Sequence, residues 1–269
     1  MPAFSLAALT VLDLAPPALI DVAASCGYDA VGIRLLPAMP GGIAYPLDDA
    51  ASLKETLARL DATGIRVADL EVVALRPETE IATFSAFFET GARLGAKHIL
   101  VAGYDPDLAR FSDSFAAFCE AAAPYGLTAD LEFMPWTCVP DLATANRIVA
   151  PMGQANAGIL VDALHFDRSR SSVTDFAQTP AHRLHYWQLC DGPAERPTTN
   201  EALIHAARHE RMFPGEGGID LIALARAMPA DITVSLEVPT VELARTMGHK
   251  DRAQRALDAA KRVIAAARA

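Results

Sequence analysis

Four short segments in the second half of the chain each carry one side chain that can bind a metal ion. Glu132, Asp162, Gln188 and Glu237 each stand in a run of residues suited to a β-strand, and a turn or a loop with Pro, Gly or Asp follows. If these strands are parallel neighbours, the four side chains gather at one end of the sheet. Two Glu, one Asp and one Gln make an oxygen-rich site for a divalent cation such as Mn²⁺ or Mg²⁺.

The apolar surroundings of these side chains support a shared site. Glu237, for example, lies within Ser-Leu-Glu-Val-Pro. A buried carboxylate is costly unless a cation or a hydrogen-bonding partner accompanies it. A structural salt bridge would explain any one of the four, but four equivalent positions are harder to explain separately. We therefore favour one metal site.

The elements that must position these residues alternate along the chain between strand-like and helix-like segments. The strand candidates are mostly short apolar runs, as expected for parallel strands covered on both faces. They are Phe4–Val11, Ala30–Leu36, Arg66–Leu75, His98–Gly103, Thr128–Met134, Ile159–Phe166, His185–Asp191 and Thr233–Pro239. The amphipathic, Ala/Leu-rich stretches between them include Asp48–Thr63, Ile81–Leu94, Leu108–Tyr125, Asp141–Val149, Asp220–Met228 and Val241–Ala267.

Residues that favour helix ends support this division. Several glycines follow helical stretches and precede strands, where a left-handed C-cap is expected. They are Gly27, Gly64, Gly95 and Gly126. Three aspartates stand near helix starts, where a short acceptor side chain caps free N–H groups. They are Asp48, Asp141 and Asp220.

Eight strands and about eight helices in 269 residues predict an α/β fold, a single (β/α)₈ TIM barrel over residues 1–269. A doubly wound open sheet is the main alternative, but no GxGxxG follows the first strand. No linker or low-complexity tract divides the chain. In a TIM barrel the active site lies at the C-terminal ends of the strands, which is where the four candidate ligands fall.

The overall composition excludes some classes of protein. The formal net charge is −10 and no run of Lys or Arg occurs, so we expect no nucleic-acid partner. The four cysteines are scattered without a CxxC pair, which is typical of buried thiols in a reducing compartment. The apolar stretch Phe4–Leu12 lacks the basic leader of a signal peptide, and no segment reaches the length of a membrane span. We expect a cytoplasmic protein.

Five short motifs resemble one known family. They are Leu-Glu-Phe at 131–133, Val-Asp-Ala-Leu-His-Phe at 161–166, Gln-Leu-Cys-Asp-Gly at 188–192, Phe-Pro-Gly-Glu-Gly at 213–217 and Leu-Glu-Val at 236–238. In combination they resemble the sugar phosphate isomerase/epimerase superfamily, the xylose isomerase-like TIM barrels of AP endonuclease family 2. The resemblance covers most of the chain. It implies that Glu132, Asp162, Gln188 and Glu237 bind one divalent metal ion, with His165 as a substrate contact or acid/base.

One departure from the family pattern is informative. Many epimerases of this group carry His at the third ligand position, where this chain has Gln188. An amide oxygen keeps the site hard, which favours Mn²⁺, Mg²⁺ or Co²⁺ over Zn²⁺. The ligand set also resembles that of bacterial 3-dehydroshikimate dehydratases on the same barrel. A lyase is therefore an alternative to an isomerase.

Both interpretations begin with the removal of a proton next to a carbonyl group. A divalent ion stabilises the enediolate that forms. Glu132 and Glu237 come from different strands, so one can take the proton and the other return it on the opposite face of a keto-sugar or inosose. In a dehydratase, His165 would instead help a β-hydroxyl group to leave. The sequence leaves both outcomes open.

Further residues are weaker candidates for the site. Arg34 and Glu71 form either an ion pair inside the barrel or substrate contacts. Arg211 precedes the loop at 214–218, and in the family an Arg near this loop often reaches substrate oxygens. Trp136 and Phe166 stand at or just past strand ends and can wall a pocket. The other histidines form no convincing ligand cluster, although His205 and His209 have the i, i+4 spacing of a helical zinc pair.

Other classes of protein fit less well. An endonuclease IV-like enzyme needs three zinc ions, many histidines and a basic face, whereas this chain is acidic. A barrel that only binds a sugar would not need Glu132, Glu237 and His165 together. The partner we expect is a small polyhydroxy carbonyl compound, phosphorylated or not. The long C-terminal helical stretch would suit a homodimer.

Overall fold

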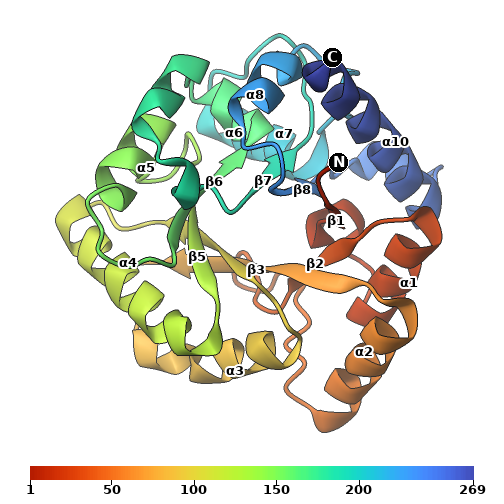
Figure 1. Cartoon of the computed structure of the whole chain (residues 1–269), viewed down its shortest axis with the longest axis horizontal. Helices are drawn as coiled ribbons and strands as arrows, with labels where there is room; N and C mark the ends of the chain where they lie inside the picture. Colours follow the sequence, from red (N-terminus) through yellow and green to blue (C-terminus); the bar gives the residue numbers. More distant parts are fainter.

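Eight short strands close into a barrel in the part of the chain that the structure describes. The structure is a computed structural model of residues 1–269, and only the side chain of Ala177 lies outside the description. Each strand pairs in parallel with its neighbour in the sequence, and β1 (Phe4–Leu6) completes the ring against β8 (Thr233–Leu236). Helices surround the strands (Figure 1). The predicted (β/α)₈ barrel is confirmed.

The remaining strands lie where the apolar runs predicted them, but several end earlier. They are β2 (Ala30–Arg34), β3 (Arg66–Leu75), β4 (His98–Gly103), β5 (Thr128–Glu132), β6 (Ala157–Asp162) and β7 (Tyr186–Leu189). The predicted strand Phe4–Val11 ends at Leu6, before the 3₁₀ turn Ala8–Val11, and the predicted strand Ile159–Phe166 ends at Asp162, where the chain turns helical. The Asp162 carboxylate accepts a hydrogen bond from the His165 N–H and so begins that helix. His165 and Phe166 are therefore helical residues.

The helices match the amphipathic stretches, and most predicted caps are present. They are α1 (Pro16–Cys26), α2 (Ala50–Thr63), α3 (Ser85–Arg93), α4 (Leu108–Ala122), α5 (Leu142–Val149), α6 (Ala163–Arg168), α7 (Asn200–His209), α8 (Leu221–Ala227), α9 (Val241–Ala244) and α10 (His249–Arg268). Asp141 and Asp220 cap α5 and α8 as predicted, but Asp49, not Asp48, caps α2. The stretch predicted at Val241–Ala267 divides into α9 and α10, and Gly248 is the N-cap of α10.

Short 3₁₀ turns occupy several connections between these elements. They are Ala8–Val11, Ile81–Phe84, Ala123–Tyr125, Val173–Gln178 and Ala181–Arg183. The glycines predicted as C-caps all have positive φ, between 70° and 82°. Within the described residues, every helix falls short of the length or the apolar character that crossing a membrane requires.

Strand alternation separates an apolar outer layer from a barrel interior in which polar groups lie beside the buried Leu100, Leu160 and Tyr186. Outward side chains such as Val101 and Leu131 join the large core that packs the strands against the helices. The opposite face of the strands carries charged or polar groups in several layers, including the buried Asp69, Glu71 and Asp130. At the C-terminal ends of the strands, the polar groups of the interior are the four candidate ligands.

Candidate active site

Consecutive strands β5 to β8 deliver the four predicted ligands to the C-terminal end of the barrel. Asp162 pairs directly with Gln188 in the β6–β7 register, and Glu132 is the last residue of β5. Glu237 follows β8 immediately. All four side chains are buried, with residue exposures between 0% and 4%. Asp162 is fully buried, and its carboxylate also caps α6.

Three side chains come close enough to share a cation. One potential ligand atom each from Glu132, Asp162 and His165 lie within 4.8 Å of one another. His165 Nε2 is 3.7 Å from Glu132 Oε1. The first turn of α6 directs the imidazole toward β5, because the His165 N–H donates to Asp162 Oδ1 at 3.0 Å. Asp162 therefore places its neighbour as well as offering its own oxygen.

Arg211 joins Glu237 to this group. Its Nη1 donates to Asp162 Oδ2, and its Nη2 lies 2.8 Å from Glu237 Oε2. Its Nε donates to the Ala207 carbonyl at 2.8 Å, so the guanidinium is held from behind. Two of the candidate ligands thus share one buried cation of the protein itself. A divalent ion would have to share the Asp162 and Glu237 oxygens with Arg211.

The buried side chains of this site include more acidic groups than basic ones. Burial, reinforced by Glu237 and Asp162, raises the pKa of Glu132 well above its usual range. Burial also raises the pKa of Glu237 to about 7, although Arg211 opposes the shift. The pKa of Asp162 is lowered, because Arg211 and His165 outweigh the opposing effect of burial. Burial lowers the pKa of His165 to about 4, so this imidazole is neutral at pH 7. Three carboxylates face one guanidinium, and a divalent cation would restore the balance.

Buried polar atoms that lack a hydrogen-bond partner also favour a divalent cation at this site. Both amide atoms of Gln188 and Oε1 of Glu132 are buried without a hydrogen-bond partner among the described residues. Nδ1 of His165 is likewise buried without a hydrogen-bond partner among the described residues. Buried polar atoms ordinarily have partners. The oxygen-rich donor set therefore suits a divalent cation, and His165 offers it a nitrogen as well.

A cavity of about 440 Å³ opens onto this group. Glu132, His165, Arg211 and Glu237 line it, so the reactive groups face a space large enough for a small molecule. Trp136 also lines it, with its ring edge-on to His165 and the ring centroids 5.0 Å apart. Much of the remaining wall is apolar. These residues are Leu9, Leu12, Val72, Ala74, Leu100, Ala102 and Met134.

Of the weaker candidates, some line the cavity and others do not. Arg34 lines the cavity, and its Nη2 is 2.6 Å from Glu71 Oε2. Glu71 is fully buried and also accepts the Ala8 N–H at 2.9 Å, so it holds Arg34 in place. Phe166 stacks on Phe176, with the ring centroids 5.5 Å apart. Glu71 and Phe166 are not among the described residues that line the cavity.

The sequence interpretation missed Asp191, which organises the loop beyond Arg211. This fully buried carboxylate accepts backbone N–H groups across that loop, at 2.8 to 3.1 Å. The donors are Gly192, Gly215, Gly217 and Ile219. A Cβ at Gly217 would overlap the Asp191 carboxylate, so the loop requires glycine there. The Cys-Asp-Gly motif after β7 was the available signal.

We expect the Asp191→Ala variant to lose roughly 3 kcal/mol of stability, because several buried N–H groups lose a charged acceptor. For a chain of this size that is a fall of about 6–12 °C in Tm. Asp220→Ala is the control, since Asp220 accepts only the Ala223 N–H at the start of α8 and is worth about 1 kcal/mol. Thermal unfolding followed by circular dichroism compares the two. Equal losses would show that Asp191 is an ordinary cap.

The fold and the site together define a class, a TIM barrel with a carboxylate-rich centre at the C-terminal ends of its strands. The chain belongs to the xylose isomerase-like TIM barrel family, whose model matches residues 20–263. That match confirms the resemblance drawn from the motifs.

Curated relatives of the chain include two kinds of enzyme. An inosose isomerase of Bacillus subtilis (strain 168) is 27% identical over 192 residues, which cover 68% of this chain and 66% of the relative. A 3-dehydroshikimate dehydratase of Pseudomonas aeruginosa is 29% identical over 114 residues, 42% of this chain and 17% of the relative. In both cases the matched region spans less than two thirds of the relative's length.

A solved structure shows the same fold over nearly the whole chain. It is a crystal structure of an IolI protein with a bound zinc atom. The sequence identity is 22%, the match covers 98% of each chain, and the TM-score is 0.80.

Proposed function

We propose that this protein is a divalent-metal-dependent isomerase or epimerase of a small polyhydroxy carbonyl compound, a keto-sugar or an inosose. The observation that carries the proposal is a pair of buried glutamates, Glu132 and Glu237, from different strands of one cavity. Each has a raised pKa. The inosose isomerase relative supports the substrate class.

The metal ion would be held by Glu132, Asp162, Gln188 and Glu237, with His165 close enough to Glu132 to contribute. When bound, it supplies a Lewis acid that polarises the substrate carbonyl. The three carboxylates and the amide oxygen favour Mn²⁺ or Mg²⁺, while the nitrogen of His165 would also admit Co²⁺ or Zn²⁺. The zinc in the IolI structure supports a cation in this type of barrel.

The two glutamates would exchange protons with carbon. A carboxyl group with a pKa of about 7, as at Glu237, can accept and return a proton near neutral pH. One glutamate would remove the proton next to the carbonyl, and the other would return one from the opposite face. Arg211 fixes the orientation of Glu237 through the contact at 2.8 Å. Trp136, with its ring edge-on to His165, would form one wall of the space in which this exchange takes place.

His165 would act on an oxygen of the substrate. Its imidazole is neutral at pH 7, lines the cavity and lies 3.7 Å from Glu132. A neutral imidazole can take a proton from one hydroxyl group and deliver it to a neighbouring oxygen. Together with return of the carbon-bound proton to the former carbonyl carbon, that transfer would move the carbonyl along the carbon chain, as isomerisation requires. Epimerisation instead returns the proton to the carbon that lost it.

A lyase of the 3-dehydroshikimate dehydratase type is the second candidate. Gln188 at the third ligand position and the Pseudomonas relative favour it. The same glutamate would remove a proton next to the carbonyl, and His165, 3.7 Å from Glu132, would pass that proton to the departing β-hydroxyl group, which leaves as water. The apolar wall of the cavity, with Val72 and Leu100, would suit a substrate that carries fewer hydroxyl groups than an inosose.

Solvent deuterium distinguishes these functions in one experiment. The Mn²⁺-loaded protein is incubated in D₂O with keto-sugars, inososes and 3-dehydroshikimate, and NMR follows the carbon next to each carbonyl. Deuterium in a recovered or rearranged sugar supports the isomerase, whereas loss of a hydroxyl group supports the lyase. Exchange that continues after chelation and removal of the metal would contradict the metal-dependent mechanism.

We expect His165→Asn to retain the metal but to lower turnover by roughly 10²-fold or more, the usual loss on removing an acid/base group. The four oxygen ligands remain in this variant, so the cation should still bind. Metal content and turnover are measured on the same preparation. His182→Asn serves as control, because His182 is an exposed residue of the turn Ala181–Arg183 and is not among the described residues that line the cavity. An unchanged rate would remove His165 from the mechanism.

A further inference from the structure

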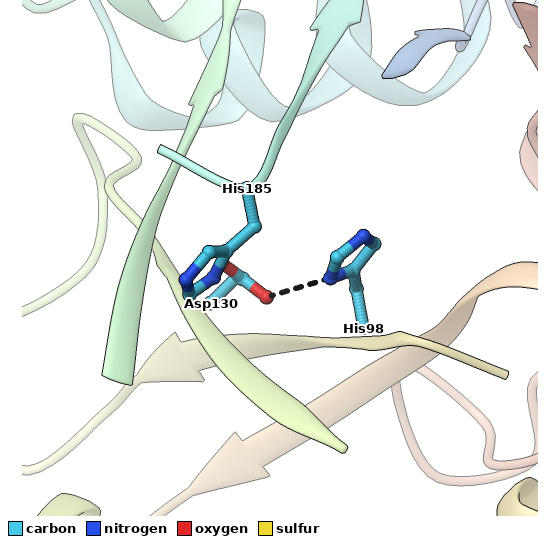
Figure 2. Close-up of side chains that lie close together, drawn as sticks. All are labelled: His98, Asp130 and His185. Carbon is cyan, nitrogen blue, oxygen red and sulfur yellow. Dashed lines mark hydrogen bonds and ion pairs between the residues drawn. The ribbon is translucent and has the colours of Figure 1, made fainter. Parts of the chain in front are cut away.

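A second group of ligand-type side chains lies at the opposite end of the barrel. His98 begins β4, Asp130 is the third residue of β5, and His185 directly precedes β7. Because these strands are parallel, their N-terminal ends meet at one edge. Figure 2 shows the three side chains together, with His98 directed toward the Asp130 carboxylate. This overturns our expectation that these histidines form no cluster.

The distances within this group suit a small cation. His185 Nδ1 lies 2.7 Å from Asp130 Oδ1, the distance of a hydrogen bond, and His98 Nδ1 lies 3.8 Å from Oδ2, which accepts a hydrogen bond from Thr128 Oγ1. Neighbouring ligands around a tetrahedral zinc ion, each at 2.0–2.1 Å, stand about 3.3 Å apart, which falls between these two values. Thr128 Oγ1 adds an oxygen 2.8 Å from His98 Nδ1. Two imidazole nitrogens, a carboxylate and a hydroxyl group form a donor set suited to zinc.

The surrounding residues build this arrangement. Asp130 is fully buried, and Gly158 lies against it. A Cβ at Gly158 would overlap Asp130 Oδ1 and lie 2.5 Å from His185 Nδ1, so glycine is required for this approach. The His98 ring stacks on Tyr186 at 4.9 Å between centroids, which fixes its orientation. The His98 and His185 side chains remain 16% and 17% exposed, so an ion can reach them.

We propose that His98, Asp130 and His185 bind a zinc ion that links the N-terminal ends of β4, β5 and β7. Thr128 or a water molecule would complete the coordination. This end of a TIM barrel serves stability rather than chemistry. The site would therefore be structural and independent of the proposed isomerase activity.

The test is the zinc content of the full-length protein and its variants after loading with zinc and desalting. We expect His98→Asn to hold one zinc fewer per chain than the parent, with unchanged turnover when loaded with Mn²⁺. His185→Gln is a second variant with the same expectation, in case either one folds poorly. His205→Asn is the control, because His205 and His209 form an exposed pair on α7 that could trap zinc.

A thermal measurement supplies an independent readout. Zinc at about one hundred times its Kd should raise the Tm of the parent by roughly 5–10 °C more than that of His98→Asn. Equal zinc contents and equal Tm shifts in parent and His98→Asn would overturn the proposal, and the group would then be an ion-free hydrogen-bonded cluster. Loss of zinc in His205→Asn alone would overturn it as well. The number of metal ions bound at the Glu132 end of the barrel affects neither the comparison of zinc contents nor the comparison of Tm shifts.

Discussion

Replacing Glu237 with glutamine is expected to lower turnover by at least about 10³-fold, among the largest effects of any single substitution in this chain. The variant keeps the shape of the side chain but removes the carboxylate that faces Glu132 across the cavity. It also removes the charge partner of Arg211, 2.8 Å away. A steady-state assay with the substrate identified by deuterium exchange provides the measurement.

Glu242→Gln is the matched control for this variant. Glu242 lies in α9, five residues further along the chain, and its side chain is 74% exposed. Its loss should leave turnover within a factor of two. If Glu237→Gln retained turnover comparable to this control, Glu237 would not be a proton acceptor, and the proposed mechanism would fail.

Glu237 is expected to make the metal-free protein less stable as the pH rises from about 5 to 8, whereas His165, with its pKa lowered to about 4, opposes this change. The pKa of this carboxyl group is about 7 in the folded protein and 4.5 in the unfolded chain. Between these values the folded state holds a proton that the unfolded state releases, so raising the pH favours unfolding. The contribution of Glu237 is roughly 2–3 kcal/mol between pH 5 and pH 8, and the curve flattens above pH 7.

Urea unfolding of parent and Glu237→Gln across this pH range, with a chelator present, isolates the effect. The parent should lose more stability than the variant as the pH rises. Saturating Mn²⁺ should abolish the difference in slope, because a bound cation favours the charged carboxylate. Identical pH dependence in the two proteins without metal would show that Glu237 is not held in a charge-deficient site.

The barrel could be predicted because its local signals agree. Glycines at helix ends and aspartates at helix starts divide the chain at the correct places, and apolar runs mark every strand. The predicted ends of the strands were less accurate. The Asp162 side chain ends β6 by capping α6, and this competition between strand and cap is decided by a hydrogen bond that spacing alone does not reveal.

The candidate site was only partly predictable, for a similar reason. Parallel strands bring their ends together, so Glu132, Asp162, Gln188 and Glu237 could be grouped from their positions. Arg211 was a candidate only through the family resemblance, as a contact to substrate oxygens. Its ion pairs with Asp162 and Glu237 depend on a connection held by antiparallel bridges at Asp191–Met212 and Glu210–Thr240, which no sequence period shows.

The histidine cluster at the other end could have been found by the same reasoning as the ligands. His98, Asp130 and His185 all stand at or near the starts of parallel strands. Strand starts bring side chains together just as strand ends do.

The central claim is that Glu132 and its neighbours bind one divalent cation, and manganese content tests it most directly. The parent and Glu132→Gln are prepared in a His98→Asn background, which removes the second candidate site, then loaded with Mn²⁺ and desalted. We predict about one manganese per chain in the parent and almost none in Glu132→Gln, with both proteins folded by circular dichroism. Equal manganese in the two, or none in either, would contradict the account.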